Sequence, residues 1–139
     1  MFTELSYKAC PVVLRYRDNR LEILTFRHPL AGIQLVKGTI EPGESSLDAS
    51  QRELLEEAGI ILKAEYLLPE WQRRPDEPIW SLCLMEPGDH LPDHWEHYCE
   101  DDGGHLFRFF WHPLSLPPSS EWHPVFSDAL AVIRNRVSH

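Results

Sequence analysis

Three glutamates near the middle of the chain have the spacing of a metal-binding cluster. Glu53, Glu56 and Glu57 stand at positions i, i+3 and i+4 of a segment with a helical pattern, so their side chains share one face of a helix. Neighbouring carboxylates on a helix repel one another by about 0.2 to 0.5 kcal/mol per pair. A hard divalent cation such as Mg²⁺ or Mn²⁺ would relieve this repulsion. Such an ion can also polarise a pyrophosphate and activate water.

The glutamates belong to a longer pattern of fixed residues. Residues 38–60 read GTIEPGESSLDASQRELLEEAGI and fit G-x5-E-x7-R-E-U-x-E-E-x-G-U without a gap, where U is a bulky aliphatic residue. Chance recurrence of its seven fixed positions has odds on the order of one in a million. A solvated acidic helix face would explain a Glu56-Glu57 pair alone, but not Gly38 or Arg52. The pattern resembles the signature of the Nudix hydrolase family.

The resemblance implies roles for the residues of this segment. The implied metal ligands are Glu53, Glu56, Glu57 and the backbone carbonyl of Gly38, with Glu44 completing or supporting the set. Glu53 or Glu56 would also take the proton of the attacking water, and the sequence does not choose between them. Arg52 would orient a neighbouring carboxylate, whereas without the resemblance a solvent-facing helix residue is an equal interpretation.

The segment that must position these side chains is predicted to be a helix over residues 45–58. Ser45 and Asp48 have the spacing of a capping box, and Gly59 is placed as a C-terminal stop. The apolar residues that fall on its packing side are Leu47, Leu54, Leu55 and Ala58. One side of the helix is therefore expected to pack while another carries the carboxylates.

Strand-like segments lie on both sides of this helix. The expected elements are strands over 5–16, 21–26, 33–36, 61–68 and 79–85, a hairpin around Gly103-Gly104, and a helix over 125–137. A turn at Asp18-Asn19-Arg20 joins the first two strands. A two-residue turn at Gly103-Gly104 would make both faces of the later hairpin aromatic, which predicts interior sheet. This order indicates a mixed α/β sandwich, and the resemblance implies a Nudix-type α/β/α sandwich with a mixed β-sheet.

Residues outside the central pattern are candidates for substrate binding. Lys37 could meet a phosphate, although a surface lysine is nearly as good an interpretation. Arg27 resembles an arginine that is often found in the family, with a solvated strand end as the alternative. Many family members add one more acid, for which Glu100 is favoured because the predicted hairpin turns it toward aromatic neighbours. Asp101 and Asp102 are interpreted as a polar hairpin tip.

Composition limits the partners and the compartment. The chain carries 13 Lys and Arg against 22 Asp and Glu, a net charge of −9, which disfavours binding to a nucleic-acid backbone. Three widely spaced cysteines indicate neither a disulfide framework nor a zinc site, which fits a reducing cytoplasm. No apolar run approaches the ~18 residues of a membrane span. A single domain over residues 1–139 is expected, and a homodimer is left open.

The predicted activity is hydrolysis of a pyrophosphate bond in a nucleoside diphosphate linked to another group. Nucleoside triphosphates, nucleotide sugars and dinucleoside polyphosphates all contain this bond, and the pattern does not choose among them. The alternative is a catalytically silent Nudix-like module that binds a nucleotide, although no carboxylate of the pattern is lost. Residues 70–78 and 86–105 are expected to determine specificity, and Trp71 or Trp80 to stack on a base.

Most of the histidines are predicted to be structural or surface residues. They lack the helical pairing or the cysteine partners of a zinc site. The residues concerned are His90, His94, His97, His105 and His112.

Overall fold

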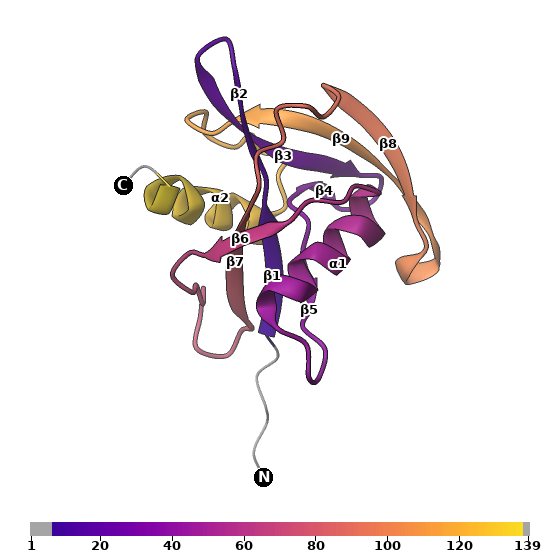
Figure 1. Cartoon of the computed structure of the whole chain (residues 1–139), viewed down its shortest axis with the longest axis vertical. Coiled ribbons are helices and arrows are strands. Elements are labelled where there is room, and N and C mark those ends of the chain that lie inside the picture. The colour runs from indigo at the N-terminus through magenta and orange to yellow at the C-terminus, as the bar shows by residue number, and fades with distance from the viewer. Residues whose placement is uncertain (1–6, 138–139) are drawn as a thin grey trace.

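The computed structural model describes residues 7–137, apart from the side chain of Asp102, and contains two curled sheets, two α-helices and one short 3₁₀ helix (Figure 1). The first sheet has the order β5-β1-β7-β6, with strands Gly38–Thr39, Tyr7–Val12, Ile79–Met85 and Ala64–Leu67. The second has the order β2-β3-β9-β8, with strands Leu14–Arg17, Arg20–His28, His105–Pro113 and His94–Cys99, and β4 (Gly32–Gln34) beside β3. Strands β1 and β7 are parallel and the other pairs are antiparallel. No helix of the described chain is long and apolar enough to cross a membrane.

The predicted first hairpin exists, but its first strand is divided. Asp18 and Asn19 both have positive φ, 53° and 63°, as a two-residue type I′ turn requires, and this turn joins β2 to β3. The strand expected over 5–16 separates at Val13, so that β1 pairs in the first sheet and β2 in the second. Residues 5 and 6 lie outside the described part. One continuous stretch of sequence therefore connects the two sheets.

Helix α1 (Ser46–Ala58) confirms the predicted helix and both of its ends. The Ser45 hydroxyl accepts the Asp48 N–H at 3.0 Å, and Gly59 ends the helix with φ 73°. Leu54 and Ala58 are buried as expected, whereas Leu55 is 47% exposed, so its place on the packing side was wrong. The buried side instead includes Glu53 and Glu57. The packing face of α1 thus overlaps its carboxylate face.

Two apolar clusters place the helices on opposite sides of the first sheet. In the first, Cys10, Val12 and Leu82 of the sheet pack with α2 (Pro124–Val137). In the second, Cys83 and Met85, which point the other way from the same sheet, pack with α1. This layering confirms the predicted α/β/α sandwich.

The β8–β9 connection differs from the predicted two-residue turn. Cys99 pairs with His105, so the loop has five residues, 100–104, and contains the short helix Asp101–Gly103. The register is therefore shifted by three residues, and an odd shift reverses the faces of a strand. His97, not Tyr98, lies on the same face as Phe107. Strand β8 is also an edge strand with an exposed Tyr98, so the prediction of interior sheet was wrong for β8, whereas β9 lies inside the sheet between β3 and β8.

Candidate active site

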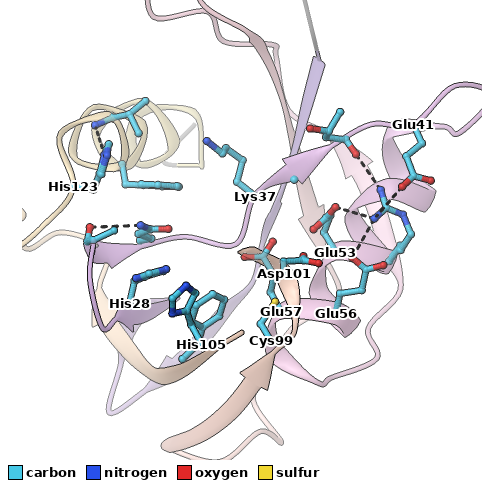
Figure 2. Close-up of a pocket in the computed structure, with 18 residues that line it drawn as sticks. His28, Lys37, Glu41, Glu53, Glu56, Glu57, Cys99, Asp101, His105 and His123 are labelled. Atoms are coloured by element: carbon cyan, nitrogen blue, oxygen red, sulfur yellow. Dashed lines mark hydrogen bonds and ion pairs between the residues drawn. The ribbon is translucent and has the colours of Figure 1, made fainter. Parts of the chain in front are cut away.

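A cavity of about 720 Å³ lies against the carboxylate face of α1, and its two sides differ in chemistry (Figure 2). We call Glu53, Glu56, Glu57 and Asp101 the acidic wall, and His28, His105, His123 and Lys37 the histidine wall. Figure 2 shows the three histidines on one side of the pocket, Glu53 and Glu56 on the other, and Lys37 between them. The two aromatic side chains Phe107 and Phe126 also line the cavity.

Two carboxylates of the acidic wall are buried against each other. Glu53 is 6% exposed and Glu57 8%. Burial, followed by the contact with Glu53 and the charge of Asp101, raises the pKa of Glu57 well above its usual value. This arrangement favours a positive ion at the acidic wall.

Glu56 is the open member of the cluster. Its side chain is 45% exposed, and partial burial together with the charge of Glu53 raises its pKa. It can therefore exchange protons with water in the pocket more readily than the buried pair.

Gly38 allows a carboxylate to lie directly against the backbone of β5. A Cβ atom at this position would stand 1.9 Å from Cδ of Glu53 and 2.1 Å from its Oε1, closer than any side chain tolerates. The absence of a side chain at residue 38 therefore leaves the space in which the Glu53 carboxylate lies.

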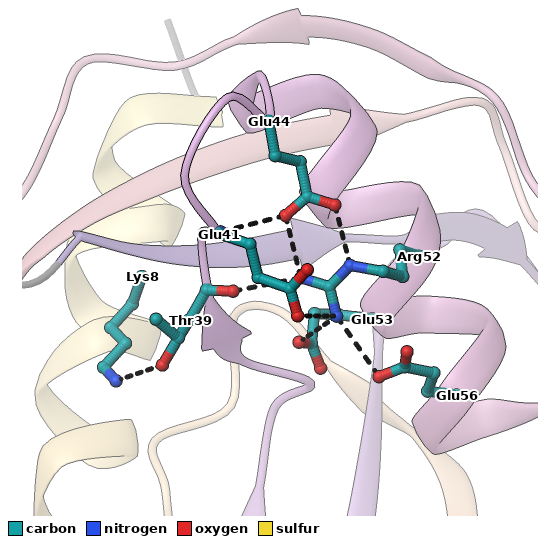
Figure 3. Close-up of polar contacts among 7 residues, drawn as sticks. All are labelled: Lys8, Thr39, Glu41, Glu44, Arg52, Glu53 and Glu56. Carbon is teal, nitrogen blue, oxygen red and sulfur yellow. Dashed lines mark hydrogen bonds and ion pairs between the residues drawn. The ribbon is translucent and has the colours of Figure 1, made fainter.

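Arg52 connects the acidic wall to the loop that precedes α1 (Figure 3). Its guanidinium donates to both oxygens of Glu44 at 2.7 and 2.9 Å, to Oε1 of Glu53 at 2.8 Å and to the Thr39 carbonyl at 3.0 Å. The bonds from Arg52 lower the pKa of Glu44 to about 2. Glu44 is thus engaged by Arg52, which fits a supporting position better than that of a ligand.

The donor set of the acidic wall fits a hard divalent cation. Within residues 7–137, no three His, Cys, Asp or Glu side chains already converge as a formed metal site, and Arg52 contacts both Glu53 and Glu56. Carboxylate oxygens are nevertheless the ligands that Mg²⁺ and Mn²⁺ prefer. The buried Glu53–Glu57 pair also requires an opposing charge when both groups are ionised.

Only some of the site residues that were predicted outside the central pattern line this pocket. Lys37 lines it, with Nζ at 5.1 Å from the Trp80 ring and 5.3 Å from the Phe126 ring, and burial lowers the pKa of this lysine. Arg27 lies outside the pocket and forms an ion pair with Glu121. The predicted substrate contact of Arg27 therefore lacks support from its position.

Glu100 also lies outside the pocket, and Asp101 lines it instead. The preference for Glu100 depended on the two-residue turn, and the five-residue loop removes its premise. Glu100 and Asp101 are both exposed in the hairpin loop, so the interpretation of Asp101 as a polar hairpin tip is confirmed, and Asp101 lines the pocket as well. The side chain of Asp102 lies outside the described part of the chain.

Sequence reasoning missed most of the pocket opposite α1. His28 ends β3, His105 begins β9 and His123 precedes α2, so that no local spacing connects them. Residues 70–78, expected to govern specificity, contribute nothing to the described lining, and neither do Trp71 or Trp80. Trp80 is buried beneath Lys37, where its face is covered rather than available to a base.

Comparisons with known proteins agree with this architecture. No curated protein matches the chain in sequence. Three similar structures are a NUDIX hydrolase from Nitrosomonas europaea (TM-score 0.70, 14% identity, covering 100% of this chain and 75% of that one), a C. elegans Ap4A hydrolase (0.64, 16%, 97% and 98%) and an ADP-ribose pyrophosphatase from Streptococcus suis (0.62, 16%, 98% and 94%). At such low identity these likenesses establish the fold alone.

The family itself is established by the match of the sequence to a family model. The model of the NUDIX domain matches residues 7–130, which includes the whole acidic segment, the histidine wall and the first half of α2. The chain therefore belongs to the Nudix hydrolase family.

Proposed function

We propose that this protein hydrolyses a pyrophosphate bond in a nucleoside diphosphate linked to another group, with Mg²⁺ or Mn²⁺ as cofactor. The observation that carries the proposal is the buried Glu53–Glu57 pair beside a pocket large enough for a nucleotide. Two ionised carboxylates that are buried side by side destabilise a protein unless a cation lies against them. The residues proposed to hold the cation are Glu53, Glu56, Glu57 and the backbone carbonyl of Gly38.

In the proposed reaction a water oxygen bonds to phosphorus while the bond from that phosphorus to the bridging oxygen breaks. The bound cation would withdraw charge from the phosphate oxygens and lower the pKa of the water. Glu56 would receive the proton of the water, because its side chain is open to the pocket and its pKa is raised. Two phosphate-bearing products leave.

Arg52 is proposed to act on the reaction through Glu53. Its bonds to Glu44 and to the Thr39 carbonyl anchor the guanidinium, which also donates to Oε1 of Glu53 at 2.8 Å and, more weakly, to Oε2 of Glu56 at 3.3 Å. We therefore assign Arg52 as a positioning residue. Gly38 would complete the positioning by leaving space for the same carboxylate.

The names of the similar structures agree with a small nucleotide substrate. One is called an Ap4A hydrolase and another an ADP-ribose pyrophosphatase, and both names refer to compounds with a nucleoside diphosphate unit. Together with the negative charge of the chain, this supports a small-molecule substrate over a nucleic acid.

The proposal is tested by product release from a panel of nucleoside triphosphates, nucleotide sugars and dinucleoside polyphosphates. Each compound is incubated with Mg²⁺, with Mn²⁺ and with a chelator. Cleavage that the chelator abolishes is the expected result. Nucleotide binding without cleavage of any compound would instead identify the chain as a silent binding module.

A further inference from the structure

The histidine wall gathers three imidazoles from three separate elements. The rings of His28 and His105 have their centroids 4.8 Å apart, and His28 lies 5.2 Å from the Phe107 ring. His123 lies 5.8 Å from Phe126, the same ring beneath the Lys37 ammonium. Aromatic packing therefore holds the polar side chains of this wall in place.

Hydrogen bonds from the backbone select the tautomer of two of these rings. Nδ1 of His28 accepts the Leu30 N–H at 3.0 Å, and Nδ1 of His123 accepts the Val125 N–H at 3.3 Å. A neutral imidazole that accepts at Nδ1 carries its hydrogen on Nε2. His28 and His123 thus possess an Nε2–H donor without needing to be protonated.

Lys37 adds a positive charge to these donors. Its ammonium lies over Trp80 and Phe126, an arrangement that stabilises a cation. Donors together with a cation match phosphate oxygens. Sugar hydroxyls would need the donors but not the charge. In a chain with a net charge of −9, a local cation is needed wherever a phosphate binds away from a metal ion.

We infer that the histidine wall binds a phosphate group beyond the two that the scissile bond joins, so that the preferred substrates carry at least three consecutive phosphates. The inference rests on the proposed hydrolysis at the acidic wall, because that reaction places the other two phosphates there. Nucleoside triphosphates and dinucleoside polyphosphates have the required group, and nucleotide sugars do not.

The test is calorimetric binding of non-hydrolysable methylene-bridged analogues of adenosine diphosphate and triphosphate, each with Mg²⁺. The two compounds share base and ribose and differ by one phosphate. We expect the unaltered protein to bind the triphosphate analogue about tenfold more tightly than the diphosphate analogue. His105→Phe keeps a ring but removes the donors, and Lys37→Met keeps the apolar stem but removes the charge. Each should reduce the ratio to below about threefold.

Two control variants separate hydrogen bonding from other effects. His105→Gln retains a donor and should keep most of the preference, and His90→Phe changes an exposed histidine outside the pocket and should keep all of it. Imidazole ¹⁵N chemical shifts of the unaltered protein give a readout that needs no variant. The Nε2 signal of His123 should move more with the triphosphate analogue than with the diphosphate analogue.

Specific outcomes would overturn the inference. An unchanged ratio in both His105→Phe and Lys37→Met would remove the phosphate contact. Tighter binding of both analogues by His105→Phe would show that the wall stacks on the base. Chelator-sensitive hydrolysis without any triphosphate preference would leave the proposed function standing and the inference refuted. A preference that the variants abolish, in a protein that cleaves no nucleotide, would refute the proposed function alone.

Discussion

The two walls of the pocket are built in opposite ways. Most of the acidic wall comes from a single turn of α1, and its members repel one another. The histidine wall comes from β3, β9, the residue before α2 and the residue before β5. Its members pack on aromatic rings, and His28 and His123 accept backbone hydrogen bonds. The acidic wall is therefore an arrangement that a ligand must stabilise, whereas the fold alone stabilises the histidine wall.

This difference predicts a division of roles between the two walls, turnover for the acidic wall and substrate choice for the histidine wall, that variants can test. Changes in the acidic wall should remove turnover of every substrate, since all would share the same scissile bond. Changes in the histidine wall should alter the choice among substrates and leave the rate of the best one closer to normal. Loss of all activity from a single histidine substitution in a folded protein would contradict the division.

The largest effect is expected from Glu56→Gln and Glu57→Gln. Each keeps the shape of the side chain but removes a proposed metal ligand, and we expect turnover to fall by on the order of a thousandfold, about 4 kcal/mol of transition-state stabilisation. Initial rates at saturating Mg²⁺ measure the loss. The matched control is Glu70→Gln, at an exposed glutamate outside the pocket. Near-normal turnover in both variants would eliminate the metal assignment.

Gly38→Ala should have the next largest effect. The new methyl group would stand 1.9 Å from Cδ of Glu53, so the carboxylate must move, and we expect about a hundredfold loss of kcat in a folded protein. The double variant with Glu53→Asp provides the check. Both changes displace the same carboxylate, so their losses should not add, and fully additive losses would show that Gly38 acts in another way.

The acidic wall could be predicted because its signals are local in sequence. The helix, its Ser45 cap and its Gly59 stop follow from spacing alone, and Gly38 and Arg52 follow from the pattern that contains the glutamates. The hydrogen bond between Arg52 and Glu53 is also local, because the two residues are adjacent in the sequence. Short-range rules are sufficient for this half of the site.

The histidine wall could not be predicted, because strand pairing brings its members together. His28 approaches His105 only through the pairing of β3 with β9. No turn residue in the sequence predicts the register of that pairing. The wrong loop length at residues 100–104 shows the same limitation, since one misjudged turn moved the expected acid from Asp101 to Glu100. The separation of β1 from β2 at Val13 likewise depends on which sheet each segment completes.

Arg52→Lys should produce a smaller loss of kcat. It alters the position of Glu53 without removing a proposed metal ligand. Lysine keeps the charge but cannot bond both oxygens of Glu44 and reach Glu53 at once. We expect kcat to fall about tenfold with little change in KM, and unfolding free energy to fall by about 1 to 2 kcal/mol. Arg74→Lys, at an exposed arginine with a 3.8 Å contact to Glu77, is the control. An equal effect at Arg74 would contradict the positioning role.

The smallest effect is the pH dependence of stability in chelator, which separates the buried Glu57 from Glu44, the carboxylate that Arg52 binds. Glu57 has its pKa raised above the ordinary 4.5, so in the folded state it keeps its proton after the unfolded chain has released it. Stability therefore falls as pH rises above about 4.5. Glu57→Gln should therefore stabilise the protein at pH 7 and have no effect near pH 4.

Glu44 should behave in the opposite way, because its pKa is lowered to about 2. Its contribution to stability is present above pH 4.5 and disappears as pH falls toward 2, so Glu44→Gln should destabilise the protein at pH 7. Thermal unfolding of both variants from pH 3 to pH 8 measures the two signs. Adding Mg²⁺ at pH 7 should raise the Tm of the unaltered protein and not that of Glu57→Gln. If Mg²⁺ raised the Tm of Glu57→Gln as much as that of the unaltered protein, the ion would bind elsewhere than at the buried pair.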